Sequence, residues 1–427
     1  MSNVAIIGGG WAGMACAVEA TQAGHAVTVF EAARNWGGRA RALTATLPDG
    51  QEVTLDNGQH ILIGAYTRTL ELMARVGVDV ERALQRVPLI LRFPDGGGLS
   101  LPQMPRWLDR ATRRIAPLDV LAGVLGARGW TWRDKLSLLA TSTQWKKQAF
   151  TCPDDQTVAS LCATLTPRVR AELTDPLCVS ALNTPADQAS GKVFLRVLAE
   201  ALFYTPGGSQ LLLPRVDLGA LFPDTADRWL REQGARTVLG QRVRTLSRAD
   251  EGWRVDDEPF DRVVLACSPW EAARLTAGLA SRWSEVAEAL PHESIATIYA
   301  HGDVALQAPF VSLRSEADAP AQFAFDRGQL GGPKGLLAFV ISASNGDRDT
   351  LQQQVLAQAR AQLGLDRLQP VLTVVERRAT FACTPGLVRP PMRIADGLLA
   401  CGDYVEGNYP GTLEGAVRSA IAASGAL

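Results

Sequence analysis

The sequence of 427 residues is poor in metal-binding side chains: it has four histidines, and its seven cysteines are scattered along the chain. No CxxC pair occurs and no histidine lies at metal-ligand spacing, so a structural zinc site is not expected. An odd number of dispersed cysteines also argues against the disulfide framework of secreted domains. We therefore expect a protein of a reducing compartment with no bound metal.

An excess of charge of either sign is also absent. The chain carries 43 basic and 44 acidic side chains, a net charge of −1, which gives no electrostatic footprint for nucleic acid. No apolar run approaches the roughly 20 residues that cross a bilayer. The N-terminus, MSNVAIIGGG, lacks the basic and apolar segments of a signal peptide. These absences predict a cytoplasmic protein.

Residues 4–31 have the pattern of a dinucleotide-binding unit. An apolar strand, VAII, leads into GGGWAG, an Ala-rich helical segment and a second apolar strand that ends at Glu31. Gly8, Gly10 and Gly13 form the pattern GxGxxG. In that pattern the first glycine permits the tight turn, the second lets the backbone approach a pyrophosphate, and the third lets the helix pack on the sheet.

The predicted helix starts around Trp11 and Ala12, where free N–H groups and a partial positive charge suit the phosphates. Glu31 follows Gly13 by 18 residues, close to the roughly 20 expected for an acid that binds ribose hydroxyls. An acid there also disfavours a 2′-phosphate and hence NADP. An ordinary βαβ turn stays as the alternative.

The segment after Glu31 distinguishes FAD from NAD. It reads EAARNWGGRARA and includes Gly38 and Arg39. Paired glycines give the backbone a second approach to a diphosphate, and a guanidinium neutralises it. This extension resembles the flavin-binding segment of the amine oxidase and carotenoid desaturase superfamily, and the resemblance implies FAD as the cofactor.

Later segments resemble the rest of that superfamily's flavin site. They read LDNGQHILIGAY, RVVLACSP, GLLACGD and TLEGAVRSAIAAS. The last is a closing helix whose N-terminus would point at the N1/O2 edge of the flavin, where negative charge gathers on reduction. The residues implied are Asn57, Gly58, Gln59 and His60 beside the ring, Val243 at the adenine, Gly402 and Asp403 at the ribityl chain or pyrophosphate, and Thr412 and Leu413 at the N1/O2 edge.

One family resembles the chain over nearly its whole length. The stretches GGGWAG, LDNGQHILIGAY, PGGSQLLLPRVDLGALFPD, ERRATFACTPGLVRP and TLEGAVRSA together resemble hydroxysqualene dehydroxylases, the squalene-associated FAD-dependent desaturase-like proteins of bacterial hopanoid pathways. The resemblance implies reductive dehydroxylation of hydroxysqualene to squalene. A hydride from N5 of the reduced flavin would pass to the allylic cation left by loss of water.

The leaving hydroxyl needs a proton in that reaction. Plausible donors near the flavin are His60, Tyr409 and Glu406, and we favour His60, with Tyr409 as the second catalytic candidate. A flavin-bound water is an equal alternative, and His60 could also be a satisfied core imidazole.

The resemblance implies an α/β fold in two parts. Residues 1–80, 204–275 and 388–427 would form a discontinuous, Rossmann-like FAD-binding domain. Residues 81–203 and 276–387 would form a mixed α+β substrate-binding domain, whose Val, Leu and Phe content suits a long apolar isoprenoid.

Trp130, Trp132 and Trp145 lie near basic residues in the first insert. Tryptophan beside basic residues suits a membrane-surface patch, whereas core helices with a basic exterior explain the residues alone somewhat better. A substrate from the bilayer, delivered by upstream hydroxysqualene-forming enzymes, would favour peripheral contact with the inner face of the bacterial membrane. Both interpretations stay open.

Other functions fit the same motifs. An oxidative desaturase of a phytoene-like polyene would run hydride transfer in reverse, and a flavoprotein could carry squalene precursors without chemistry. An amine oxidase is less expected, because no cysteine is placed for covalent flavin attachment and none of the five lysines falls in the flavin motifs.

Overall fold

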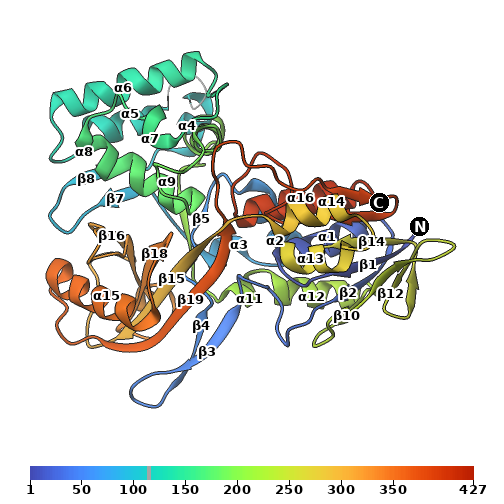
Figure 1. Ribbon diagram of the computed structural model, residues 1–427. Helices are drawn as coiled ribbons and strands as arrows, with labels where there is room; N and C mark the ends of the chain where they lie inside the picture. The colour runs from blue at the N-terminus through green and yellow to red at the C-terminus, as the bar shows by residue number, and fades with distance from the viewer. Residues whose placement is uncertain (113–116) are drawn as a thin grey trace.

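The computed structural model describes residues 1–112 and 117–427. Figure 1 shows three regions: a sheet covered by helices that holds both chain termini, a helical region at the upper left, and an antiparallel sheet at the lower left. None of the helices in the described ranges is long and apolar enough to span a membrane.

A six-stranded sheet forms the core of the first region, in the order β10-β2-β1-β14-β21-β20. All neighbours pair in parallel except β20 and β21. Short apolar runs buried on both faces are typical of parallel strands, and VAII and RVVL satisfy this condition. The bounds are β1 Asn3–Ile7, β2 Ala26–Phe30, β10 Arg236–Val238, β14 Arg262–Leu265, β20 Arg393–Ala395 and β21 Leu398–Ala400.

Helices from both ends of the chain cover this sheet. Helix α1 packs on α16, the C-terminal helix, and on α12, and α16 packs in turn on α2. The first and last segments of the chain therefore lie side by side (Figure 1). The bounds are α1 Trp11–Gln22, α2 Thr67–Arg75, α3 Val80–Ala83, α11 Leu218–Leu221, α12 Pro223–Glu232, α13 Pro269–Thr276, α14 Ser281–Glu288 and α16 Leu413–Ser424.

Small antiparallel units extend the first region. The segment LPDGQ connects the two strands of a hairpin, β3 and β4. A three-stranded meander lies between β10 and β14, and β9 pairs with both β5 and β6. The bounds are β3 Ala42–Thr46, β4 Glu52–Asp56, β5 Leu62–Ile63, β6 Leu84–Val87, β9 Leu211–Pro214, β11 Leu246–Arg248, β12 Trp253–Val255 and β13 Glu258–Phe260.

The second insert forms a five-stranded antiparallel sheet, in the order β16-β17-β18-β15-β19. Helix α15 packs on β19. The bounds are β15 His292–His301, β16 Phe310–Ser312, β17 Phe323–Asp326, η3 Arg327–Leu330, β18 Leu336–Ser342, α15 Arg348–Leu363 and β19 Gln369–Phe381.

The first insert is mainly helical, with one hairpin, β7-β8, that packs against β16 of the second insert. Helix α6 starts with a capping box in which the Thr131 and Asp134 side chains bond to each other's backbone N–H. The bounds are β7 Ile90–Arg92, β8 Gly98–Ser100, α4 Arg106–Thr112, α5 Leu118–Leu125, α6 Trp132–Lys147, α7 Val158–Leu161, α8 Pro167–Val169, η1 Arg170–Thr174, α9 Asp175–Leu182, α10 Gly191–Leu198 and η2 Ala199–Tyr204.

The strands agree with the expected division of the chain in one respect. All six strands of the parallel sheet come from residues 1–80, 204–275 and 388–427, and the five-stranded sheet comes from 276–387. The pairing of β6 with β9 joins the first insert to the segment that begins at 204. The domain boundaries themselves stay a prediction.

Candidate active site

A single cavity of about 740 Å³ extends from the Gly-rich turn after β1 into the two inserts. Its wall collects nearly all the site residues proposed from the sequence. Gly13 and Glu406 lie outside the wall, and Glu406, considered as a proton donor, is exposed on the surface. The predicted residues that line it are Gly8, Gly10, Trp11, Ala12, Glu31, Gly38, Arg39, Asn57, Gly58, Gln59, His60, Val243, Gly402, Asp403, Tyr409, Thr412 and Leu413.

The three glycines of the first turn differ in what surrounds them. A Cβ on Gly8 would lie 2.6 Å from the Ala266 carbonyl oxygen, and one on Gly13 would lie 1.8 Å from the Gly8 carbonyl oxygen. These two glycines are required by packing within the protein. A Cβ on Gly10 would meet no atom closer than 3.9 Å, so the space in front of Gly10 is open to a ligand.

Helix α1 begins next to that open space. Its N-cap, Gly10, offers no side-chain hydrogen bond to the first turn, so the turn's N–H groups can bind an anion together with the helix dipole. Gly38, at φ +61°, approaches Gly10 from the other side, with its Cα 3.9 Å from that Cβ position. The two Gly-rich segments thus lie against each other, with the Gly37 N–H donating to the Gly9 carbonyl at 2.9 Å, and both line the same end of the cavity, which we call the channel.

Glu31 closes the end of this channel at β2. Its two carboxylate oxygens accept hydrogen bonds from the backbone N–H of Gly9 and of Ala33, each at 2.7 Å. The carboxylate therefore holds the Gly-rich turn in place, and its remaining lone pairs can accept from ribose hydroxyls.

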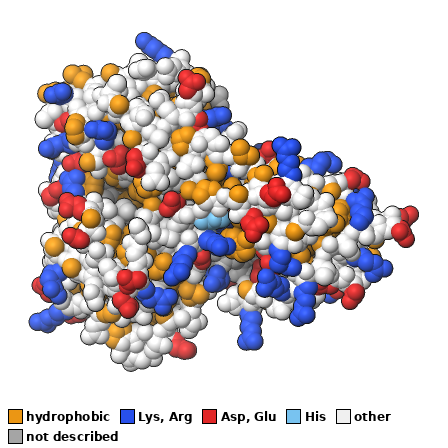
Figure 2. All heavy atoms as spheres, in the orientation of Figure 1, with side chains coloured by type: hydrophobic (Ala, Val, Ile, Leu, Met, Phe, Trp, Pro, Cys, Tyr) orange, Lys and Arg blue, Asp and Glu red, His pale blue; other side chains and the backbone are white. Residues whose placement is uncertain are grey.

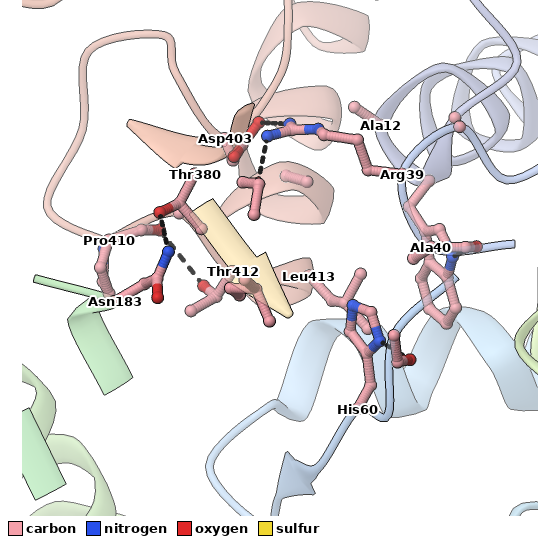
Figure 3. Close-up of a pocket in the computed structure, with 18 of the residues that line it drawn as sticks. Ala12, Arg39, Ala40, His60, Asn183, Thr380, Asp403, Pro410, Thr412 and Leu413 are labelled. Atoms are coloured by element: carbon pink, nitrogen blue, oxygen red, sulfur yellow. Dashed lines mark hydrogen bonds and ion pairs between the residues drawn. The ribbon is translucent and has the colours of Figure 1, made fainter. Parts of the chain in front are cut away.

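Arg39 and Asp403 meet across the cavity although 364 residues separate them. Arg39 Nη2 lies 2.5 Å from Asp403 Oδ1, and Arg39 Nη1 donates to the Ala379 carbonyl at 2.6 Å (Figure 3). Burial alone would lower the pKa of Arg39, but the Asp403 carboxylate outweighs it and the pKa is raised. The Arg39 guanidinium therefore stays charged beside the channel, and its ion pair with Asp403 is neutral overall.

His60 lies beside Leu413 in the cavity (Figure 3). Its Nδ1 is 2.7 Å from the Gly58 carbonyl oxygen, and burial lowers its pKa more than this bond raises it, with the Arg39 charge lowering it further. The imidazole is therefore neutral at neutral pH. Because a carbonyl only accepts, Nδ1 carries the proton and Nε2 keeps a lone pair.

Helix α16 begins at the cavity wall with Thr412 and Leu413. The Thr412 hydroxyl caps the helix by accepting from the Gly415 N–H at 3.1 Å. Glu414 points away, where it accepts from the Thr69 N–H at 2.9 Å and pairs with Arg418 at 2.7 Å. This buried carboxylate caps α2, so its negative charge is neutralised outside the cavity and the α16 N-terminus is fixed in place.

Val243 and Tyr409 lie in other parts of the same wall. The Val243 carbonyl accepts from Arg274 Nη2 at 2.8 Å. The backbone N–H of Val243 is therefore the group that could contact adenine. Tyr409 is half-buried, and the Arg418 guanidinium lies 5.0 Å from its ring centroid.

The part of the cavity away from the Gly-rich turn is apolar. Helices α9 and α10, strands β7 and β9, and the five-stranded sheet supply its side chains, and the rings of Phe323 and Phe325 each lie 5.2 Å from that of Phe310. The apolar lining consists of Leu89, Leu91, Leu177, Phe194, Val197, Leu198, Leu211, Ile295, Phe310, Phe323, Phe325 and Val340.

Three site residues were not found by sequence reasoning. Asn183, in a left-handed conformation after α9, bonds Thr380 Oγ1 and the Ala343 N–H. Arg327 reaches Gln59 Oε1 at 3.3 Å from a position 268 residues away. Tyr404 lines the cavity, and its buried hydroxyl has no hydrogen-bond partner among the residues that the structure describes. Of the three, only Asn183 has a recognisable sequence signal, because it is an asparagine at the end of a helix.

One cysteine, Cys267, lines the cavity. Within the described ranges no group of metal-ligating side chains was found, and the seven cysteines are free thiols. Burial raises the pKa of Cys267 to about 12, so this cavity-lining thiol is protonated.

Comparison with known proteins identifies the family of the chain. It belongs to the family of flavin containing amine oxidoreductases, whose model matches residues 11–427. It is similar to hydroxysqualene dehydroxylases from Rhodopseudomonas palustris (28% identical) and Sinorhizobium fredii (26% identical), in each case over 98% of this chain and 96% of the relative. The resemblance inferred from the motifs is therefore confirmed.

Other similarities are shorter or confined to the fold. An 83-residue stretch, 19% of this chain and 16% of the relative, is 40% identical to zeta-carotene desaturase from Synechocystis sp.. An oxidoreductase structure from Methanosarcina mazei shares the fold, with a TM-score of 0.71, 16% identity, and coverage of 98% of this chain and 99% of that one. The expected α/β flavoprotein fold is confirmed.

The residues of the cavity fit FAD. Open space in front of Gly10 can admit a pyrophosphate, the uncapped start of α1 can bind it, and the unpartnered Tyr404 hydroxyl can donate to it. The fit and the family together identify the protein as an FAD-dependent oxidoreductase.

Proposed function

We propose that the protein catalyses the reductive dehydroxylation of hydroxysqualene to squalene. The observation that carries this proposal is the continuity of one cavity from a dinucleotide channel to an extended apolar chamber. Full-length similarity to proteins named hydroxysqualene dehydroxylase supports the choice of substrate. A long isoprenoid alcohol fits a chamber lined by leucine, valine and phenylalanine, because burying its apolar surface drives binding.

In this proposal Gly10 and Gly38 would hold the pyrophosphate of FAD, Glu31 would accept from the ribose hydroxyls, and the Arg39 guanidinium would lie nearby as a positively charged donor. Reduced FAD supplies the hydride that replaces the hydroxyl. The N-terminus of α16, at Thr412 and Leu413, provides a partial positive charge for the flavin edge at which negative charge collects.

The chain must also protonate the leaving hydroxyl. His60 is the first candidate, and it must be charged to donate from Nε2 because Nδ1 is committed to Gly58. Its lowered pKa makes the imidazolium scarce at neutral pH and also a stronger acid when present. Tyr409, which lines the same cavity, is the second candidate.

The apolar chamber has a second role in this reaction. It surrounds the allylic end of the substrate with side chains that hold no water, so that a carbocation formed there meets hydride before it meets solvent. Peripheral contact with a membrane, through which so apolar a substrate would arrive, belongs to the same proposal.

The test is product analysis with purified, chemically reduced protein. Incubation with hydroxysqualene in detergent should yield squalene in proportion to protein. The local similarity to zeta-carotene desaturase favours one competing function, so oxidised protein is incubated with phytoene in parallel. Formation of a more unsaturated polyene without squalene would replace the proposal by a desaturase, and bound flavin with no product in either reaction would leave a carrier.

A further inference from the structure

The helical region carries an unusual group of exposed apolar side chains. Trp107 is 72% exposed and Trp132 69% exposed, the two most exposed tryptophans of the described chain. Leu121, Leu125 and Leu136 are also exposed. By contrast, Trp130 and Trp145, which the sequence had grouped with Trp132, are buried in the core. We call Trp107, Leu121, Leu125, Trp132 and Leu136 the outer apolar surface.

These five side chains belong to packed neighbouring helices. Helix α4 packs on α5, and Lys135 of α6 donates from Nζ to the Leu125 carbonyl at 2.6 Å. The same ammonium lies 5.3 Å from the centroid of the Trp132 ring. The pairs Leu121/Leu125 and Trp132/Leu136 are each four residues apart and so share a helix face. The surface is therefore one area across α4, α5 and α6.

The charge of this region is one-sided. All three acids of α4–α6 are buried: Asp109 accepts from the Gly207 N–H, and Asp134 accepts from Thr131 and Thr166. The third, Asp119, is buried as well. Among residues 110–147 whose exposure the structure describes, the exposed charged side chains are therefore all basic. They are Arg110, Arg128, Arg133, Lys146 and Lys147. A chain with a net charge of −1 concentrates basic charge here.

The outer apolar surface and the apolar chamber share their supporting elements. The α4 carboxylate of Asp109 holds the turn at Gly207, next to the chamber-lining Ser209. Beyond the C-terminal end of α6, the centroid of the Phe150 ring lies 4.6 Å from that of Phe203, with the rings tilted to each other; Phe203 belongs to η2, which also lines the chamber. Figure 1 places α4–α6 at the upper left, away from both termini, and Figure 2 shows orange and blue side chains together in this region, with a few red ones among them.

We propose that the outer apolar surface docks onto an anionic lipid membrane. Exposed tryptophan and leucine would enter the interface, and the surrounding arginines and lysines would pair with anionic head groups. A second protein chain with an apolar patch would not explain why every acid of the region is turned inward. The inference rests on the proposed function only for the nature of the substrate that such docking would deliver.

The experiment is vesicle flotation of the full-length holoprotein with phosphatidylcholine vesicles, with and without phosphatidylglycerol. The protein should bind the anionic vesicles and be released by high salt, which screens charge. Leu121→Ser/Leu125→Ser should weaken binding about tenfold, since two apolar side chains leave the interface. The matched control is Leu239→Ser/Leu279→Ser, whose leucines have similar exposure (37% and 38%, against 40% and 44%) elsewhere on the molecule.

Charge is tested in the same assay. Arg133→Glu/Lys147→Glu should weaken binding by at least tenfold, because each basic residue near an anionic surface contributes about a fivefold factor. Arg254→Glu/Arg348→Glu, which changes net charge equally on other elements, should have a much smaller effect. If both double variants lost vesicle binding equally, the attraction would depend on the net charge of the protein and not on this surface, and the proposal would be overturned.

Two further outcomes would also overturn it. One is the absence of binding to either kind of vesicle. The other is self-association in solution that Trp107→Ser/Trp132→Ser abolishes, which would make the surface an interface between copies. Flotation does not require turnover, so the two proposals can fail separately. Vesicle binding without squalene formation would reject the proposed function and keep the docking surface. Squalene formation without vesicle binding would keep the proposed function and reject the docking surface.

Discussion

At the cofactor end of the cavity, backbone groups and a few charged side chains provide the contacts, whereas at the other end the wall is made of side-chain hydrocarbon. The cofactor end comes from the first 60 residues, from the segment around Val243 and from the last 30, and packing leaves no room for a side chain at Gly8 or Gly13. The apolar end is assembled from α9, α10, β7 and the five-stranded sheet. A cofactor of fixed structure needs fixed donors, while an apolar substrate needs volume and few polar groups.

The comparison implies that a substitution at one end of the cavity can impair FAD binding, and a substitution at the other end can impair turnover of the substrate, each without the other. The largest effect is expected for Gly10→Ala. Because the new methyl group would occupy space open to the ligand and touch no protein atom within 3.9 Å, the protein should fold and yet lose FAD. We expect affinity to fall more than about a hundredfold, as in a steric block of a pyrophosphate site, measured by flavin absorbance relative to protein. Gly278→Ala, also in open space, should retain FAD; loss of folding in Gly10→Ala would contradict this account.

His60→Ala should keep FAD and slow squalene formation by about a hundredfold or more, the usual contribution of a general acid. The pH dependence gives the sharper result. Since the pKa of His60 lies below its ordinary value of 6.5 and only the imidazolium can donate from Nε2, the wild-type rate should increase as pH falls through 6.5. This increase should vanish in His60→Ala. A flat wild-type profile with normal turnover in the variant would transfer the role to Tyr409 or to water.

Leu177→Glu places a charge in the apolar wall. Because Leu177 is half-buried and lines the chamber, the variant should bind FAD normally and lose about a hundredfold in kcat/KM for hydroxysqualene, the cost of a carboxylate facing hydrocarbon. Leu177→Met, which keeps an apolar wall, should be close to wild type. Parallel loss of FAD would show that the two ends of the cavity are not independent.

Tyr404→Phe should have the smallest effect, a loss of FAD affinity of about tenfold, typical of a hydrogen bond to a charged group. The thermal stability of the flavin-free protein should not fall, because the hydroxyl has no partner among the described residues. Tyr299→Phe is the opposite control: its hydroxyl donates to the Asp56 carbonyl at 3.0 Å, so this variant should lose stability and keep FAD. Unchanged FAD affinity in Tyr404→Phe would remove the residue from the site.

The same contrast explains what the sequence could predict. The Gly-rich turn, its flanking strands and the final helix follow from local patterns of apolar residues, glycine and caps, and α16 lies where the patterns predicted it. Arg39 and Asp403 were both assigned to the cofactor, although their direct contact could not be foreseen from positions 364 residues apart.

Features set by tertiary packing were out of reach. Trp130 and Trp132 are two residues apart in the same basic stretch, yet Trp130 donates from Nε1 to buried Glu172 at 2.8 Å, and Trp132 faces solvent. Glu414 caps α2 from 345 residues away, and nothing in its neighbourhood in the sequence indicates that partner. The lowered pKa of His60 likewise depends on burial and not on its motif.

The most direct test of the account is anaerobic stopped-flow absorbance of the photoreduced protein mixed with hydroxysqualene, with products extracted at matched times. We predict that the flavin is reoxidised at the rate at which squalene forms. Flavin that stays reduced while hydroxysqualene remains intact would contradict the central claim that the apolar chamber presents this substrate to the cofactor.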